Sequence, residues 1–187
     1  MPESFAGMAH RALAELGTVV DRMPEGAIAP LVEAILSAKR MVLHGLGREG
    51  LQMRGLAMRL FHMGLDVHVW GDMTMPPLSG GDLLVVSAGP GHLVTVEALM
   101  EVAKAAGAKT AIVTAEPGGP APKRADVVLA IPAQTMASDQ SGDLSILPMG
   151  SLFEMSQMLV FEMLVLKLRD RLGETAETMR RRHTNLE

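Results

Sequence analysis

The chain has 187 residues, of which 48% are hydrophobic and 20% charged, as expected of a globular domain with a substantial core. Its net charge of −4 and its low aromatic content, with four Phe, one Trp and no Tyr, argue against a nucleic-acid-binding surface. It contains no cysteine, which excludes disulfides, thiolate metal sites and thiol catalysis and is compatible with a cytoplasmic location.

Helices and strands are expected to alternate along the chain. Apolar positions at helical spacing predict helices over residues 5–19, 27–38, 48–63 and 92–106, and a charged helix is expected at about 174–182. Short apolar runs between them predict strands over residues 41–43, 66–70, 82–86, 109–114 and 126–131. Apolar strands that alternate with helices are typical of a parallel sheet covered on both faces, so the predicted fold class is α/β.

Residues 152–168 are apolar almost all round the helix that they are expected to form. Glu154, Glu162 and Lys167 interrupt this run, which disfavours a membrane span. We therefore expect a helix that is buried in the core or at a subunit interface.

The first predicted strand runs into a glycine-rich turn, Gly45-Leu46-Gly47-Arg48-Glu49-Gly50. Glycines at a strand-to-helix turn let a ligand approach the backbone N–H groups at the positive end of the helix, which favours phosphate binding. The spacing G-x-G-x-x-G is also the dinucleotide fingerprint, and Asp72 follows the second strand, where an acid would reach a ribose. A second glycine loop at residues 87–91 favours a phosphosugar held between two strand ends, because a dinucleotide needs one such loop.

Two segments near the C-terminus are more specific than either loop. Residues 146–154 read Ile-Leu-Pro-Met-Gly-Ser-Leu-Phe-Glu, and residues 179–187 read Met-Arg-Arg-Arg-His-Thr-Asn-Leu-Glu. Together with residues 45–48, 55–64 and 80–82, they make the chain resemble the SIS-domain (sugar isomerase) family, in particular its 6-phospho-3-hexuloisomerases. The similarity spans roughly residues 5–187.

The resemblance implies a flavodoxin-like three-layer sandwich with a five-stranded parallel sheet. It implies a single SIS domain over residues 1–187, with N-terminal helices at 5–38, an α/β core at 40–150 and C-terminal helices at 151–187. The implied activity converts a hexulose 6-phosphate to fructose 6-phosphate through an enediol, without a metal or other cofactor. The resemblance also implies a homodimer or homotetramer. From the composition we expect a cytoplasmic protein with no nucleic-acid or membrane partner. A non-catalytic phosphosugar-binding protein and an NAD-dependent oxidoreductase remain as alternatives.

The resemblance places the substrate and phosphate contacts on the two glycine loops. The candidate residues are Gly47, Arg48, Glu49, Ser87, Gly89, Gly91 and His92. Family members usually have Ser in place of Glu49 and a Ser-Gly-Ser-Gly-Glu-Thr loop in place of residues 87–92. Hydroxyls for a phosphate are therefore fewer here, and Pro90 has no N–H to donate. Glu49 either faces the site, where it would repel a phosphate dianion, or points to solvent and stabilises the start of its helix. Arg48 either steadies substrate oxygens or is a surface arginine.

Glu154 is the candidate catalytic base. Moving a carbonyl between adjacent sugar carbons requires a proton to leave one carbon and return to the next, which one carboxylate can do. The resemblance points to Glu154, and burial just inside an apolar helix would raise its pKa toward the working range. Ser151 and Glu154 also have the spacing of a capping box, a competing role that would hold the carboxylate on a backbone N–H.

His183 is the second catalytic candidate, since imidazole exchanges protons near neutral pH. A histidine so near a C-terminus is otherwise a solvated tail residue. The tail has few apolar residues, so we expect a neighbouring subunit to order it, which would make the active sites shared between subunits. Residues 180–182 are expected to be a solvated helix end. Ordinary structural or surface roles are expected for His44, His62 and His68.

Overall fold

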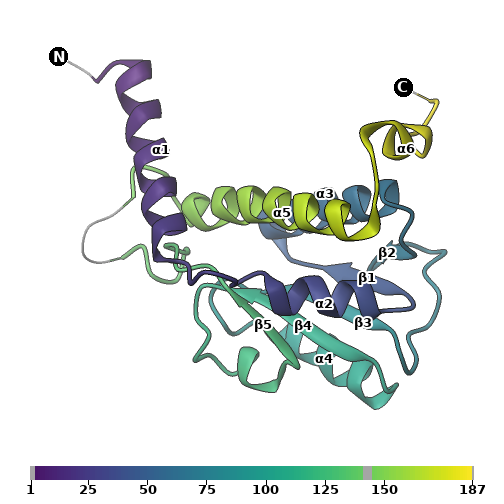
Figure 1. Cartoon of the computed structure of the whole chain (residues 1–187). Helices are drawn as coiled ribbons and strands as arrows, with labels where there is room; N and C mark the ends of the chain where they lie inside the picture. Colours follow the sequence, from purple (N-terminus) through teal and green to yellow (C-terminus); the bar gives the residue numbers. More distant parts are fainter. Residues whose placement is uncertain (1–2, 141–144, 187) are drawn as a thin grey trace.

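A five-stranded parallel sheet forms the centre of the fold in the computed structural model, which describes residues 3–140 and 145–186 (Figure 1). The strands are β1 (Met41–His44), β2 (Val67–Val69), β3 (Leu83–Ser87), β4 (Lys109–Thr114) and β5 (Val127–Ala130). They lie in the order β2-β1-β3-β4-β5, with every neighbouring pair parallel. This is the flavodoxin-like strand order, and it confirms the predicted α/β fold.

Helices cover both faces of this sheet. They are α1 (Phe5–Arg22), α2 (Ala29–Ser37), α3 (Gly47–His62), α4 (Val94–Ala105), α5 (Ser151–Leu172) and α6 (Ala176–Arg181), with a 3₁₀ turn at Pro122–Arg124. Figure 1 shows α2, α3 and α5 over one face and α4 over the other. Helix α1 crosses one end of α5 and projects beyond it, and α6 lies beyond the other end (Figure 1). The predicted helices are therefore present, with ends shifted by a few residues.

The side chains of each strand alternate between two apolar cores. In β1, Met41 and Leu43 belong to the core beneath α2, α3 and α5, whereas Val42 belongs to the core beneath α4. In β3, Leu83 and Leu84 divide between the two cores in the same way. Successive strand residues point to opposite faces, so a sheet that is covered on both sides needs uninterrupted apolar strands.

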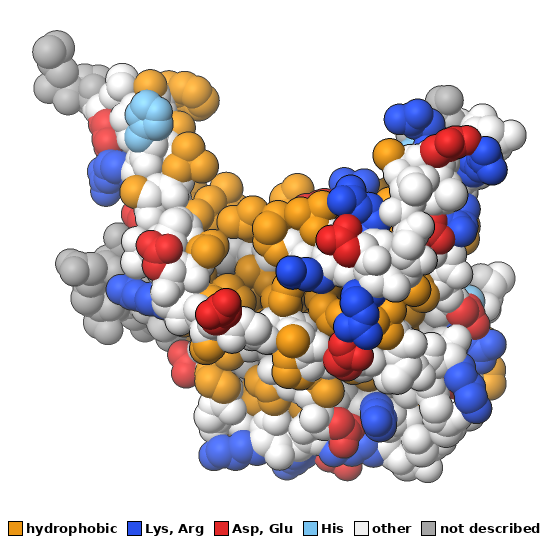
Figure 2. All heavy atoms as spheres, in the orientation of Figure 1, with side chains coloured by type: hydrophobic (Ala, Val, Ile, Leu, Met, Phe, Trp, Pro, Cys, Tyr) orange, Lys and Arg blue, Asp and Glu red, His pale blue; other side chains and the backbone are white. Residues whose placement is uncertain are grey.

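Helix α5 is buried along one side and exposed along the other. Leu164 and Leu168 have no exposed surface, whereas Met158 and Met163 are 57% and 44% exposed. Figure 2 shows apolar side chains gathered over α5, between the projecting helices α1 and α6. In the single chain, the predicted buried helix thus has an uncovered apolar side. No helix within residues 3–140 and 145–186 combines the length and apolar character needed to cross a membrane.

The strand order reverses direction between β1 and β3. After β1 the chain adds β2 on one side, and it then returns to place β3 on the other side. In open α/β sheets, ligands bind outside the carboxyl ends of the strands at such a switch point. The loops that follow β1 and β3 are the two glycine loops, so the fold brings both of them to this point.

Candidate active site

A cavity of about 400 Å³ lies between the loops that follow β1 and β3 and the start of α5. The residues that line it are Leu46, Gly47, Arg48, Glu49, Pro90, Leu93, Thr135, Met136, Met149, Gly150, Phe153 and Glu154. Most of the wall is apolar, and among these lining residues one side chain is basic and two are acidic. The cavity therefore has the usual character of a small-molecule site, with few polar groups on an apolar wall.

Glu154 lies on the cavity wall in the first turn of α5, where its side chain is 12% exposed. Its Oε2 lies 3.0 Å from the Nε of Arg48, an ion pair between the starts of α5 and α3. Burial raises the pKa of the Glu154 carboxyl, and the positive charge of Arg48 opposes this rise. A partly desolvated carboxylate held in this way can accept a proton from a ligand in the cavity.

The start of α5 is not a capping box, so that interpretation of Ser151 and Glu154 is wrong. Gly150 is the N-cap, in a left-handed conformation with φ of 79°, and no side chain caps the helix. Ser151 is instead the first helical residue, and its Oγ accepts a hydrogen bond of 2.7 Å from Arg48 Nη1. Arg48 thus contacts both Ser151 and Glu154, and no cap holds the carboxylate away from the cavity.

Glu49 turns inward from the first turn of α3 to the loop that follows β3. Its Oε2 accepts hydrogen bonds from Ser87 Oγ at 2.5 Å and from the backbone N–H of Gly89 at 3.0 Å. Burial raises the pKa of Glu49, these two hydrogen bonds oppose the rise, and the charge of Glu154 adds to it. The alternative in which Glu49 points to solvent is therefore wrong, and the glutamate is part of the cavity wall.

From the second glycine loop Pro90 lines the cavity, and the candidates Ser87, Gly89, Gly91 and His92 all lie outside its lining. Ser87, the buried last residue of β3, contacts Glu49 and also accepts from Gln157 Nε2 at 2.9 Å. Gly91 lies outside the cavity lining, where a Cβ at this position would lie 2.8 Å from the Cβ of Glu116 in the next loop. His92 also lies outside the lining, and its ring pairs with Glu97 of α4.

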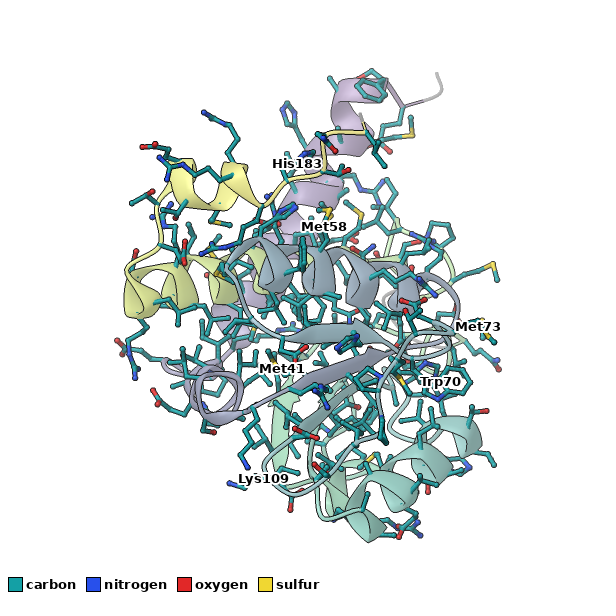
Figure 3. All side chains as sticks on the ribbon, turned by 90° about the vertical axis from the view of Figure 1, so that its right-hand side faces the viewer. Met41, Met58, Trp70, Met73, Lys109 and His183 are labelled. Atoms are coloured by element: carbon teal, nitrogen blue, oxygen red, sulfur yellow. The ribbon has the colours of Figure 1, made fainter. Side chains whose placement is uncertain are left out.

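His183 lies far from the cavity of its own chain. It lines a groove with α3 and α5, where its ring centroid is 5.1 Å from that of His62. In Figure 3, His183 lies over α3 beside Met58. Trp70, which directly follows β2, lies instead at the carboxyl ends of the strands, the end of the sheet where the cavity is found. One chain therefore does not bring His183 to Glu154. Glu187, the last residue of the C-terminal motif, lies outside the described residues.

Several wall residues have no obvious chemical signal in the sequence. Thr135, Met136 and Met149 lie in the connection between β5 and α5 in the sequence, and no motif marks them. The one local signal is Gly150, since a Cβ there would lie 2.7 Å from the backbone nitrogen of Met136. A glycine at this position lets the connection approach the start of α5 closely.

Asp72 and the glycine turn, the two features of the sequence that favoured a dinucleotide, have other roles in the structure. Asp72 lies 3.9 Å from Arg54 Nη1, in an exposed ion pair. Gly50 packs against the backbone oxygen of Gly45, which would lie 2.4 Å from a Cβ at residue 50. This glycine therefore allows α3 to approach its own loop. Within the described part of the chain, no group of three or more His, Asp or Glu side chains is arranged to hold a metal ion.

Comparison with known proteins gives consistent matches over most of the chain. Residues 34–166 match the family model of the SIS domain. The 3-hexulose-6-phosphate isomerase of Mycobacterium gastri is 39% identical over 173 residues, which are 92% of this chain and 86% of that protein. The 3-hexulose-6-phosphate isomerase of Bacillus subtilis (strain 168) is 35% identical over 157 residues, 84% of this chain and 85% of that protein. A hypothetical protein of known crystal structure superposes with a TM-score of 0.87 at 25% identity, covering 96% of this chain and 95% of that chain.

Proposed function

The chain belongs to the SIS domain family, and we propose that it is a phosphosugar isomerase that interconverts 3-hexulose 6-phosphate and fructose 6-phosphate. Relatives that carry this activity in their names match the chain from end to end of its α/β core. The observation that carries the proposal is the half-buried carboxylate of Glu154, which lines the cavity at the switch point of the sheet and is paired with Arg48.

The proposed reaction moves the carbonyl from carbon 3 to carbon 2 of the sugar. Glu154 takes the proton from carbon 2, an enediol forms across carbons 2 and 3, and the same carboxylate returns the proton to carbon 3. The hydroxyl proton leaves oxygen 2 and a proton joins oxygen 3, so the product is an isomer and no redox partner is needed.

Arg48 supports this chemistry in two ways. Its charge opposes the effect of burial on the pKa of Glu154, which keeps the carboxylate available as a base. Its Nη2 takes no part in the contacts with Ser151 and Glu154, so it can donate to the oxygen that gains negative charge as the enediol forms.

We propose that a second copy of the chain covers the apolar side of α5 and completes the site. This surface carries five partly exposed apolar residues, Met155, Met158, Leu159, Met163 and Leu166. His183 lies beside it on the groove between α3, α5 and α6, away from its own cavity. A homodimer or homotetramer in the cytoplasm would bury this surface and could bring the partner's tail to the cavity.

Replacing the proposed base tests the function. We expect Glu154→Gln to lower kcat for both directions by roughly 10²–10⁴-fold, the usual contribution of a positioned general base. In D₂O, the wild type should also place deuterium at carbon 3 of the product, because the proton that Glu154 holds while the enediol exists can exchange with solvent before it is returned. Glu101→Gln, the same change at an exposed glutamate of α4 outside the cavity lining, serves as the control. Full turnover by Glu154→Gln with an unchanged fold would exclude this carboxylate as the base.

A further inference from the structure

The loop that follows β3 has no backbone donor left for an anion between residues 88 and 91. The N–H groups of Ala88 and Gly91 donate to backbone oxygens at 3.0 and 2.9 Å. The N–H of Gly89 donates to both carboxylate oxygens of Glu49, at 3.0 and 3.2 Å, and Pro90 has no N–H. The Glu49 carboxylate therefore takes the place in this loop that a bound anion would need.

The hydroxyl group of Ser87, at the start of this loop, also donates its hydrogen bond to Glu49. Ser87 Oγ donates its one proton to Glu49 and accepts from Gln157 Nε2 at 2.9 Å. Ser87 and Gln157 have no exposed surface, so both side chains are fixed by their surroundings. A Cβ on Gly89 would lie 2.8 Å from Glu49 Oε1 and 3.0 Å from Phe153, which shows how closely the loop encloses the carboxylate.

The charges around the cavity also disfavour a dianion at this loop. Of the lining side chains described above, Glu49 and Glu154 are acidic, and Arg48 alone is basic. Both Nε and Nη1 of Arg48 are already engaged by Glu154 and Ser151. A phosphate placed at Gly89 would therefore meet the Glu49 carboxylate, and the charge of Arg48, the one cation of the lining, is already shared with Glu154.

We propose that Glu49 is a specificity-determining residue, which makes the loop at residues 87–91 bind a hydroxyl- or ammonium-bearing end of the sugar and excludes a phosphate from it. A carboxylate only accepts hydrogen bonds, so the ligand atoms that meet it must be donors. The inference rests on the proposed function for the cavity being the substrate site. It follows that the phosphate of a phosphosugar lies elsewhere, away from Ser87 and Gly89.

Sulfate is the first probe, since it remains a dianion across the working pH range. Glu49→Ser frees the Ser87 hydroxyl and the Gly89 N–H and removes the negative charge. We expect it to bind sulfate roughly tenfold or more tightly than the wild type, because one hydrogen bond to a charged group is worth at least that much. Glu49→Gln keeps the shape of the side chain, so it should show a smaller gain and provides the comparison if the serine variant does not fold. Asp72→Asn removes the same charge outside this cavity and should change nothing.

Fructose and glucosamine, which carry no phosphate, are the second probes. Isothermal titration should show that both sugars bind the wild type more tightly than Glu49→Ser, since the serine removes their carboxylate acceptor. The proposal is overturned if neither variant gains sulfate affinity, or if neither sugar loses affinity. Absence of isomerase activity in the wild type would instead contradict the proposed function and leave both binding comparisons intact.

Discussion

The Nε of Arg48 lies 3.0 Å from the Oε2 of Glu154, and this contact joins the first turn of α3 to the first turn of α5. Both residues line the cavity, so the ion pair is part of its wall. Two opposing effects therefore act on the Glu154 carboxyl: burial raises its pKa, and the charge of Arg48 lowers it.

Removing this cation should change the pH dependence of catalysis. In Arg48→Met the effect of burial remains and the opposing charge is gone, so the pKa of Glu154 rises further. The base must be ionised to act, so the acidic limb of kcat/KM moves to higher pH and the loss of activity is larger at acidic than at alkaline pH. Arg59→Met removes a similar α3–α5 ion pair, with Nε 3.1 Å from Glu162, and should leave this limb in place. An unmoved limb in Arg48→Met would mean that Arg48 does not control the ionisation of Glu154.

Two glycines in α3 should respond to alanine in opposite directions. A Cβ at Gly50 would lie 2.4 Å from the backbone oxygen of Gly45, so Gly50→Ala must displace the loop and should cost about 1–3 kcal/mol of stability. At Gly55 in the same helix no atom lies within 4 Å of such a Cβ, and Gly55→Ala should stabilise by about 1 kcal/mol. Urea denaturation of both variants measures the difference. Equal effects would show that the contact between α3 and its loop is not tight.

Much of the fold is predictable because its signals are local. Met41, Val42 and Leu43 form an uninterrupted apolar run, and the structure places them alternately in the two cores, as a doubly covered strand requires. The helix over residues 48–63 likewise follows from its periodic apolar positions, and Gly64 comes directly after it with φ of 81°. A 3₁₀ turn at Pro122–Arg124 was not predicted, since its three residues carry no periodicity.

The direction of individual side chains is less predictable. Glu49 could point to solvent or to the loop, and its contact is with Ser87, 38 residues away. Arg182 is similar, because it was expected at a solvated helix end but donates to the backbone oxygen of His62, 120 residues away. In both cases the local sequence allows either direction, and a distant segment provides the partner.

The Arg182 contact should hold the C-terminal tail on α3. Its Nη1 donates to the backbone oxygen of His62 at 2.9 Å. The Nη1 and Nη2 of Arg182 also donate to the two carboxylate oxygens of Glu174. Arg182→Gln should therefore accelerate amide hydrogen exchange in residues 176–186. Arg181→Gln breaks only an ion pair within α6, to Glu177, and is the matched control. Equal exchange rates in both variants would show that Arg182 does not dock the tail.

Acid should weaken the same contact. Hydrogen bonds from Arg182 and Thr178 lower the pKa of Glu174. A carboxyl whose pKa is lower in the folded state contributes stability above its unfolded pKa and loses that contribution as the pH falls through its folded value. The protection of residues 176–186 of the wild type, taken relative to the intrinsic exchange rate at each pH, should thus fall below the ordinary pKa of glutamate, 4.5, and Glu174→Gln should remove this pH dependence. If the loss of protection in acid persists in Glu174→Gln, another titrating group must cause it.

The proposed sharing of sites between subunits predicts complementation between two inactive variants. Glu154→Gln and His183→Ala should each lose activity alone. In a mixed dimer, one site combines both substitutions, and the other combines the intact Glu154 of one subunit with the intact His183 of its partner. Co-expression should therefore restore roughly a quarter of wild-type activity in a randomly mixed dimer, since half of the dimers are mixed and each regains one of two sites. The double variant co-expressed with the wild type controls for subunit exchange. If each site takes Glu154 and His183 from a single chain, the mixture stays as inactive as its components.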